Sequence, residues 1–226
     1  MLRDRALTES LIDRAEAAGY TALVLTADTP LLGHRIKDEA NSFTLPDGLT
    51  MENLAAAVPS TNGSGLAEYA ASQLDASLTF EALEWLCKRT SLPVVVKGVL
   101  RADDALRCVS AGTRAIIVSN HGGRQLDHAV ATADALAVVR DAVPTDIDVL
   151  VDGGIRTGTD VVKAVALGAS AVLIGRSVLW GLAVHGEKGV GAVLAQMQTE
   201  LELALALVGA PSVAGLDRSF VSLRPS

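Results

Sequence analysis

Five short hydrophobic runs recur along the chain, and longer segments of mixed polarity separate them. The runs cover residues 21–26, 93–97, 115–119, 148–151 and 171–174. Runs of four to six residues without strict alternation are typical of strands that are buried on both faces of a parallel sheet. The pattern therefore predicts five parallel strands.

Several of the intervening segments carry apolar residues at helical spacing. In residues 5–18, Leu7, Leu11 and Ile12 fall on one helical face, and Gly19 follows as a C-cap. Further helices are predicted over residues 79–90, 102–110, 131–142, 159–167 and 187–209. Strands that alternate with helices imply an α/β fold with parallel pairing and right-handed crossovers.

The spacing of the units narrows the fold class. The last four strands begin about 20 to 35 residues apart, which suits a β/α barrel or a doubly wound sheet. No G-x-G-x-x-G motif follows the first strand, so a dinucleotide-binding Rossmann fold is disfavoured.

One long polar segment interrupts this regularity. Residues 31–77 contain glycine and proline and only short helical hints. Loops of this length in compact domains usually serve a function, such as a lid or a binding loop. A disordered insert is the alternative, because residues 59–65 (PSTNGSG) resemble a flexible linker.

Composition and charge exclude several classes of partner and location. Half of the 226 residues are hydrophobic, and the net charge is −7. The absence of a basic cluster argues against nucleic acid or an anionic membrane surface as partner. Cys87 and Cys108 lack metal-ligand spacing, so we expect free thiols and no metal. Neither a signal peptide nor an apolar run of membrane-spanning length is present, which predicts a single cytoplasmic domain over residues 1–226.

The segment 116–127 (IIVSNHGGRQLD) carries the most specific chemistry. It runs from a buried strand into a polar turn, the position where α/β proteins build active sites. His121 can exchange a proton near neutral pH, and Arg124 offers a planar fork for a carboxylate or phosphate. Gly122 and Gly123 let a ligand approach the backbone closely.

The ends of the last two predicted strands carry groups that suit a phosphate. Residues 152–156 (DGGIR) and the pair Gly175–Arg176 supply backbone N–H groups, a helix N-terminus and two guanidiniums. Alone, DGG is equally consistent with a tight turn. Two such sequences on consecutive strand ends favour phosphate binding, which in β/α barrels uses the last two loops.

These motifs together resemble one known family. The sequences VSNHGGRQLD, LPVVVKGV, VLVDGGIRTGTDVVKAVALGA and VLIGR are similar to those of the FMN-dependent 2-hydroxy acid oxidases and dehydrogenases, and the similarity covers essentially the whole chain. The resemblance implies an eight-stranded β/α barrel with FMN at its mouth, and oxidation of an L-2-hydroxy acid to a 2-keto acid. It also implies a homo-oligomer, often a tetramer.

The resemblance assigns roles to residues by position. His121 matches the catalytic base, and Asp28 matches the carboxylate that pairs with it. Arg124 matches the residue that holds the substrate carboxylate, and Arg35 a second arginine on the substrate side. Lys97 matches the lysine beside the flavin ring. The other matches to flavin-binding positions are Thr26, Ser119, Asp152, Gly153, Gly154, Arg156, Gly175 and Arg176.

The strand count departs from the family pattern. A closed barrel of this kind has eight strands, whereas the chain supplies five. We expect the C-terminal portion of such a barrel, without the N-terminal third, and therefore weak FMN binding and poor turnover by this chain alone. Two alternatives stay open: a non-catalytic remnant that keeps a phosphate half-site, and a different barrel enzyme such as a relative of type 2 isopentenyl diphosphate isomerase or IMP dehydrogenase.

Overall fold

A five-stranded parallel sheet forms the centre of the molecule. The computed structural model describes residues 1–44, 46, 48–49 and 73–222. The strands are β1 (Leu23–Thr26), β2 (Val94–Val99), β3 (Ala115–Val118), β4 (Asp148–Val151) and β5 (Ala171–Val172). They lie side by side in sequence order, and each pairs in parallel with the next. The predicted five parallel strands and the α/β class are confirmed.

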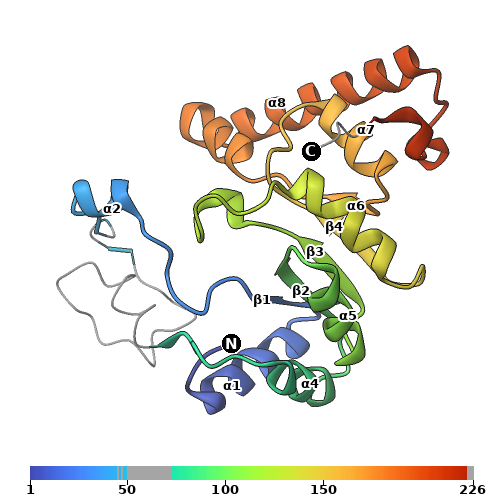
Figure 1. Cartoon of the computed structure of the whole chain (residues 1–226). Helices are drawn as coiled ribbons and strands as arrows, with labels where there is room; N and C mark the ends of the chain where they lie inside the picture. Colours follow the sequence, from blue (N-terminus) through green and yellow to red (C-terminus); the bar gives the residue numbers. More distant parts are fainter. Residues whose placement is uncertain (45, 47, 50–72, 223–226) are drawn as a thin grey trace.

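Helices follow the sheet along one side and at its two ends (Figure 1). They are α1 (Arg5–Ala17), α2 (Ile36–Ala40), α4 (Phe80–Arg89), α5 (Ala102–Ser110), α6 (Thr132–Ala142), α7 (Gly158–Ala166) and α8 (Arg176–Val208). In Figure 1, α1 and α4 lie near β1, whereas α7 and α8 lie at the opposite end of the sheet. Within the described part of the chain, no helix combines the length and the hydrophobicity needed to cross a membrane.

The last strand and the last helix differ from the prediction. The strand β5 ends at Val172 rather than at residue 174, and helical structure resumes at Arg176 rather than at residue 187. The helix α8 is interrupted at His185 and at Gly186, whose φ of +58° is accessible mainly to glycine. The helix was predicted only from residue 187 onward, although the apolar segment before it is helical as well.

The structure describes only part of the predicted loop 31–77. Residues 45, 47 and 50–72, which include the linker-like stretch, lie outside the described residues. In the described part, the short helix α2 forms. After the undescribed stretch the chain returns to the N-terminus, where Leu2 forms an antiparallel bridge with Leu74 and Arg5 pairs with Asp75 at 2.7 Å.

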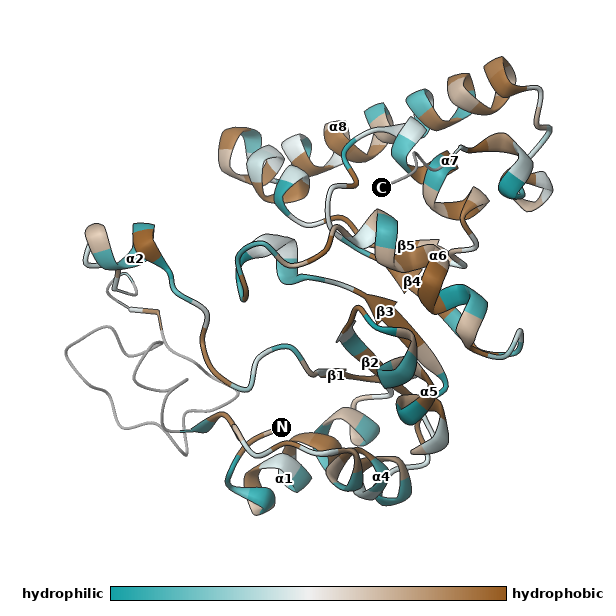
Figure 2. Ribbon diagram, in the orientation of Figure 1, coloured by the Kyte–Doolittle hydropathy of each residue, from teal (hydrophilic) through white to brown (hydrophobic). Residues whose placement is uncertain are grey.

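The hydrophobic core lies between the sheet and the helices that cover it. All four residues of β3 are buried, and Ile116 and Val118 are fully inaccessible. Figure 2 shows hydrophobic residues concentrated on β3 and β4. Burial raises the pKa of the Cys108 thiol on α5 to about 11, with smaller contributions from Asp104 and Cys87. Both cysteines are unpaired.

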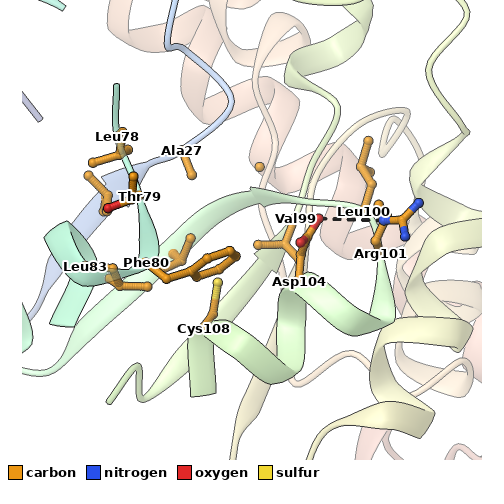
Figure 3. Close-up of a pocket in the computed structure, with 13 residues that line it drawn as sticks. Ala27, Leu78, Thr79, Phe80, Leu83, Val99, Leu100, Arg101, Asp104 and Cys108 are labelled. Atoms are coloured by element: carbon orange, nitrogen blue, oxygen red, sulfur yellow. Dashed lines mark ion pairs between the residues drawn. The ribbon is translucent and has the colours of Figure 1, made fainter. Parts of the chain in front are cut away.

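A pocket opens on the helix-covered face of the sheet, between α4 and α5 (Figure 3). Its volume is about 390 Å³, and apolar side chains such as Phe80 form most of its lining. Figure 3 shows an Arg101–Asp104 ion pair, 3.7 Å long, at one side of it. Because successive strand residues point to opposite faces, Val96 of this pocket and the neighbouring Lys97 project to different sides of β2. The pocket therefore lies on the other face of β2 from the Lys97 side chain.

Candidate active site at the carboxyl ends of the strands

The loop after β3 adopts an unusual backbone conformation that presents His121. His121, Gly122 and Gly123 form a short 3₁₀ helix, and their φ values are +57°, +65° and +74°. A positive φ is uncommon for histidine and persists only where contacts hold it. The buried Ser119 provides one such contact, because its Oγ accepts a hydrogen bond from the backbone N of His121 at 3.1 Å.

His121 and Asp28 are joined by hydrogen bonding across the strand ends. The Nδ1 atom of His121 lies 3.1 and 3.2 Å from the two carboxylate oxygens of Asp28, and the two side chains are 26% and 14% exposed. A carboxylate in this position fixes the orientation of the imidazole ring. Because Nδ1 is bonded to Asp28, Nε2 is the ring nitrogen that can exchange a proton with a ligand. The predicted pairing of these two residues is present.

Gly98 in β2 makes room for this carboxylate. A Cβ at Gly98 would lie 2.6 Å from the Cβ of Asp28, and the register between β2 and β3 shifts at this point. The φ of Gly98 is +108°, a conformation that side-chain-bearing residues rarely adopt. A glycine at this irregularity therefore allows Asp28 to approach β2 closely.

Lys97 holds a positive charge at the base of the site. Its Nζ donates to Ser119 Oγ at 2.9 Å and lies 3.1 Å from Asp152 Oδ2. The register pairs Lys97 with Thr26 on β1. The second carboxylate oxygen of Asp152 is buried and has no hydrogen-bond partner among the described residues. A buried acceptor without a partner is costly unless a ligand satisfies it.

Two arginines meet beside His121. A guanidinium nitrogen of Arg35 donates to the backbone carbonyl of Arg124. Partial burial lowers the pKa of Arg35, and the positive charge of Arg124 lowers it further, while Asp38 and Asp28 oppose the shift. Two neighbouring guanidiniums repel each other, so an anion between them would relieve the repulsion. The arrangement suits a carboxylate ligand.

Glycines and an arginine form the opposite side of the site. Gly153 and Gly154 have φ values of +85° and +81°, and a Cβ at Gly154 or Gly175 would meet no atom within 4 Å. The glycine at position 175 is the N-cap of α8, and no side chain caps this helix end. Arg176 donates to the carbonyl of Gly122 at 3.2 Å and so joins this side to the His121 loop.

The N-terminus of α7 is less available to a ligand. The side chains of Thr157 and Asp160 form a capping box there, and Asp160 also accepts from the backbone N of Arg156 at 3.1 Å. These side chains satisfy the backbone N atoms of Arg156, Thr157 and Asp160, and Glu200 accepts from that of Gly158. The open backbone donors on this side are therefore those near the glycines and at the start of α8.

One cavity of about 340 Å³ connects most of the predicted residues. Those that line it are Lys97, His121, Arg124, Asp152, Gly153, Gly154, Arg156, Gly175 and Arg176. Of the remaining four, Asp28 and Ser119 contact His121, Arg35 contacts Arg124, and Thr26 pairs with Lys97. The structure thus brings together every residue that the sequence singled out.

Two features of this site were not predicted from the sequence. Apolar side chains complete the cavity wall, and they come from the end of β5 and the unexpected first part of α8: Leu173, Ile174, Leu179 and Trp180. Gln125 links the loops after β1 and β3 through four hydrogen bonds. The sequence signal that could have identified Gln125 is its place inside the SNHGGRQ motif.

The donor set fits a flavin mononucleotide. The glycines, the N-terminus of α8 and Arg176 suit a phosphate. The unpartnered oxygen of Asp152 can accept from a ribityl hydroxyl, and the apolar wall with the Lys97 charge suits a ring that gains electrons.

Comparisons with known proteins agree with this fit. An L-lactate oxidase of Nostoc sp. is 53% identical over 226 residues, and the match covers 98% of this chain and 62% of that protein. Human 2-hydroxyacid oxidase 1 is 46% identical, with 99% and 62% covered. A solved structure of mandelate oxidase with (S)-4-hydroxymandelic acid superposes with a TM-score of 0.86 at 45% identity, covering 94% of this chain and 61% of that one.

The fold and the family follow from these matches. The chain spans about 62% of the length of the first two relatives, and the five β/α units form a partial β/α barrel, as predicted. The model of the FMN-dependent dehydrogenase family matches residues 1–223. The chain therefore belongs to the FMN-dependent dehydrogenase family.

Proposed function

We propose that this chain carries the FMN and substrate groups of an oxidoreductase that converts an L-2-hydroxy acid to a 2-keto acid. The observation that carries the proposal is the His121–Asp28 pair, 3.1 Å apart, beside Arg124 and Arg35 at the same strand ends as the phosphate-type donors. The names of the relatives, lactate oxidase, 2-hydroxyacid oxidase and mandelate oxidase, support this substrate class.

The substrate side follows from the charges of its residues. Arg124 and Arg35 bind the carboxylate of the hydroxy acid and so orient its second carbon and hydroxyl toward His121. His121 accepts a proton from the substrate at Nε2, and Asp28 stabilises the resulting imidazolium through Nδ1. FMN, when bound, supplies the acceptor for the two electrons that leave the substrate.

The cofactor side uses the other residues of the cavity. Lys97 would hold a positive charge beside a bound flavin and stabilise negative charge on it, and Thr26 and Ser119 would hydrogen-bond it. Asp152 accepts from the ribityl chain. The phosphate is held by Gly153, Gly154, Arg156, Gly175 and Arg176.

The open sheet limits what the chain does by itself. Among the described residues, β1 and β5 each pair on one side only, and Val24 is 55% exposed. We propose that residues 1–226 act as one domain that binds FMN weakly and turns over poorly until further strands complete the barrel. A non-catalytic remnant with a phosphate half-site is the second candidate, and the open edges favour it. Cytoplasmic location and a tetrameric assembly stay predictions.

Flavin spectroscopy on two proteins tests the proposal. One is the 226-residue chain, and the other has the uncovered part of the Nostoc lactate oxidase fused ahead of Met1. We expect the fusion to hold about one FMN and to bleach when L-lactate, glycolate or (S)-mandelate is added without oxygen. The chain alone should bind little flavin.

Each contrary result has a distinct meaning. A fusion that holds FMN but is not bleached by any of the hydroxy acids would support the non-catalytic remnant. A folded fusion without FMN would contradict the phosphate assignment. Stoichiometric flavin and full turnover in the 226-residue chain would contradict its dependence on further strands.

A further inference from the structure

Gln125 uses its whole side-chain amide to join two loops. Its Nε2 donates to the backbone carbonyls of Asp28 and Leu31, each at 2.8 Å. Its Oε1 accepts from the backbone N of Gly33 at 3.2 Å and from Nη2 of Arg35 at 2.7 Å. Two carbonyl acceptors at one end and two donors at the other fix the orientation of the amide. Every hydrogen bond crosses from the loop after β3 to the loop after β1.

The backbones of the two loops also touch. A Cβ at Gly33 would lie 2.4 Å from the carbonyl oxygen of Arg124 and 2.6 Å from the Cα of Gln125. Such distances to backbone atoms leave no space for a side chain, so the contact requires glycine at position 33. The φ of Gly33 lies outside the left-handed region, so the constraint here is space alone.

We propose that Gln125 is a positioning residue for the substrate side of the site. Through the Gly33 and Arg35 bonds it holds the Arg35 guanidinium beside Arg124, and through the Asp28 carbonyl it holds the loop that carries the partner of His121. This inference rests on the proposed function for the role of the two arginines. We call the hydrogen bonds and backbone contacts between residues 28–35 and 121–125 the lock. The lock itself rests on these contacts alone and not on the proposed function.

Loss of this amide has a specific consequence. Arg35 keeps its bond to the Arg124 carbonyl, but it loses its second acceptor, and the backbone N of Gly33 loses its partner. The loop 28–35 then moves more freely, and the Arg124 carbonyl is the acceptor that still holds the Arg35 guanidinium. Carboxylate binding weakens in the ground state and in the transition state alike, so KM rises more than kcat falls.

Amide hydrogen exchange on the 226-residue chain tests the lock. Gln125→Met keeps the length of the side chain and removes all four hydrogen bonds. Gly33→Ala adds a methyl group that overlaps the backbone of the other loop and so forces the two loops apart. In both variants we expect amide exchange over residues 29–35 to become about tenfold faster, which corresponds to losing the net stabilisation of one hydrogen bond. Exchange in β2, β3 and β4 should stay unchanged. Unchanged exchange over residues 29–35 would overturn the lock.

Two control variants match these changes elsewhere in the chain. Gln198→Met removes one exposed hydrogen bond to Glu202 on α8. Gly191→Ala adds a methyl group where no atom lies within 4 Å. Neither should change exchange over residues 29–35, and acceleration in either control would show that the assay reports general loosening and so would overturn the assignment to Gln125.

Kinetics of the fusion protein test the positioning role. We expect Gln125→Met to raise KM for the hydroxy acid about tenfold, with kcat within about threefold of the parent. A purely structural role would reduce the active fraction, lowering kcat at constant KM, and that result would overturn the proposal. An inactive parent fusion would overturn the proposed function and the positioning role together, whereas the lock is judged by exchange alone.

Discussion

The central strand and the two edge strands of the sheet differ sharply in burial. All four residues of β3 are buried, whereas on β1 Val24 is 55% exposed and on β5 neither residue is buried. A strand with neighbours on both sides has its backbone groups paired and its side chains covered, whereas an edge strand leaves one side of its backbone unpaired and covers its side chains less fully. The sheet is thus well packed at its centre and open at its margins.

The site depends on both regions. His121 extends from the packed centre, but its partner Asp28 follows the edge strand β1, and Gly175 and Arg176 follow the other edge, β5. The central strand fixes the reactive imidazole, while the groups that complete the site lie where the sheet is open. This difference is the basis of the proposal that the chain retains the residues of the site and depends on further strands to function.

Shortening a side chain at the centre should have the largest effect on stability. Ile116→Ala removes buried methyl groups from a fully inaccessible residue and should lower the free energy of unfolding by about 2 to 5 kcal/mol. Val24→Ala at the edge should cost less than about 1 kcal/mol. Urea unfolding of both variants measures the contrast, and equal losses would contradict the difference between centre and edge.

High pH should weaken the helix-covered side through Cys108. Its pKa is raised to about 11 by burial, against 9.0 ordinarily. Above pH 9 the unfolded chain loses this proton while the folded chain keeps it, so stability falls as pH rises from 9 to 11. The loss is on the order of 2 kcal/mol.

The comparison that isolates this effect is wild type against Cys108→Ala. Both proteins share all other groups that titrate at high pH, so only the difference between their unfolding free energies is informative. That difference should change between pH 9 and 11 and be flat between pH 7 and 9. A constant difference across the whole range would show that Cys108 ionises normally in the folded chain.

Arg176 should have a smaller effect, at the β5 edge. Its side chain is exposed, so its contribution to phosphate binding is reduced by solvent. Arg176→Ala in the fusion should raise the Kd for FMN about tenfold, or about 1.4 kcal/mol, in a fluorescence titration. Arg101→Ala, an exposed arginine paired with Asp103, is the control and should leave the Kd unchanged. No effect at position 176 would remove this residue from the phosphate site.

The sequence was most informative where one signal determined the outcome. Continuous β-branched runs such as Ile116–Val118 predicted the strands, because burial on both faces excludes alternation. The residues at the strand ends could be placed together because the carboxyl ends of parallel strands meet on one edge of the sheet. For this reason His121 contacts Asp28, and Ser119 bonds both His121 and Lys97.

Other features depend on tertiary contacts that no local pattern encodes. Gly98 is a glycine because of Asp28, which lies 70 residues earlier, and Gln125 bonds residues more than 90 positions away. The first part of α8 was missed because the glycines around it favour a loop. Their effect is overcome where Gly181 packs against Gly189 across the break in the helix.

The rate of flavin bleaching tests the central claim most directly. In the fusion protein without oxygen, His121→Asn should retain FMN but slow bleaching by the hydroxy acid by about 10²- to 10⁴-fold, the usual contribution of a general base. His128→Asn is a close control, because His128 is also a histidine with a positive φ, +59°, and asparagine tolerates that conformation. It should bleach at the parent rate. Equal bleaching rates in the two variants would contradict the role of His121 as the base.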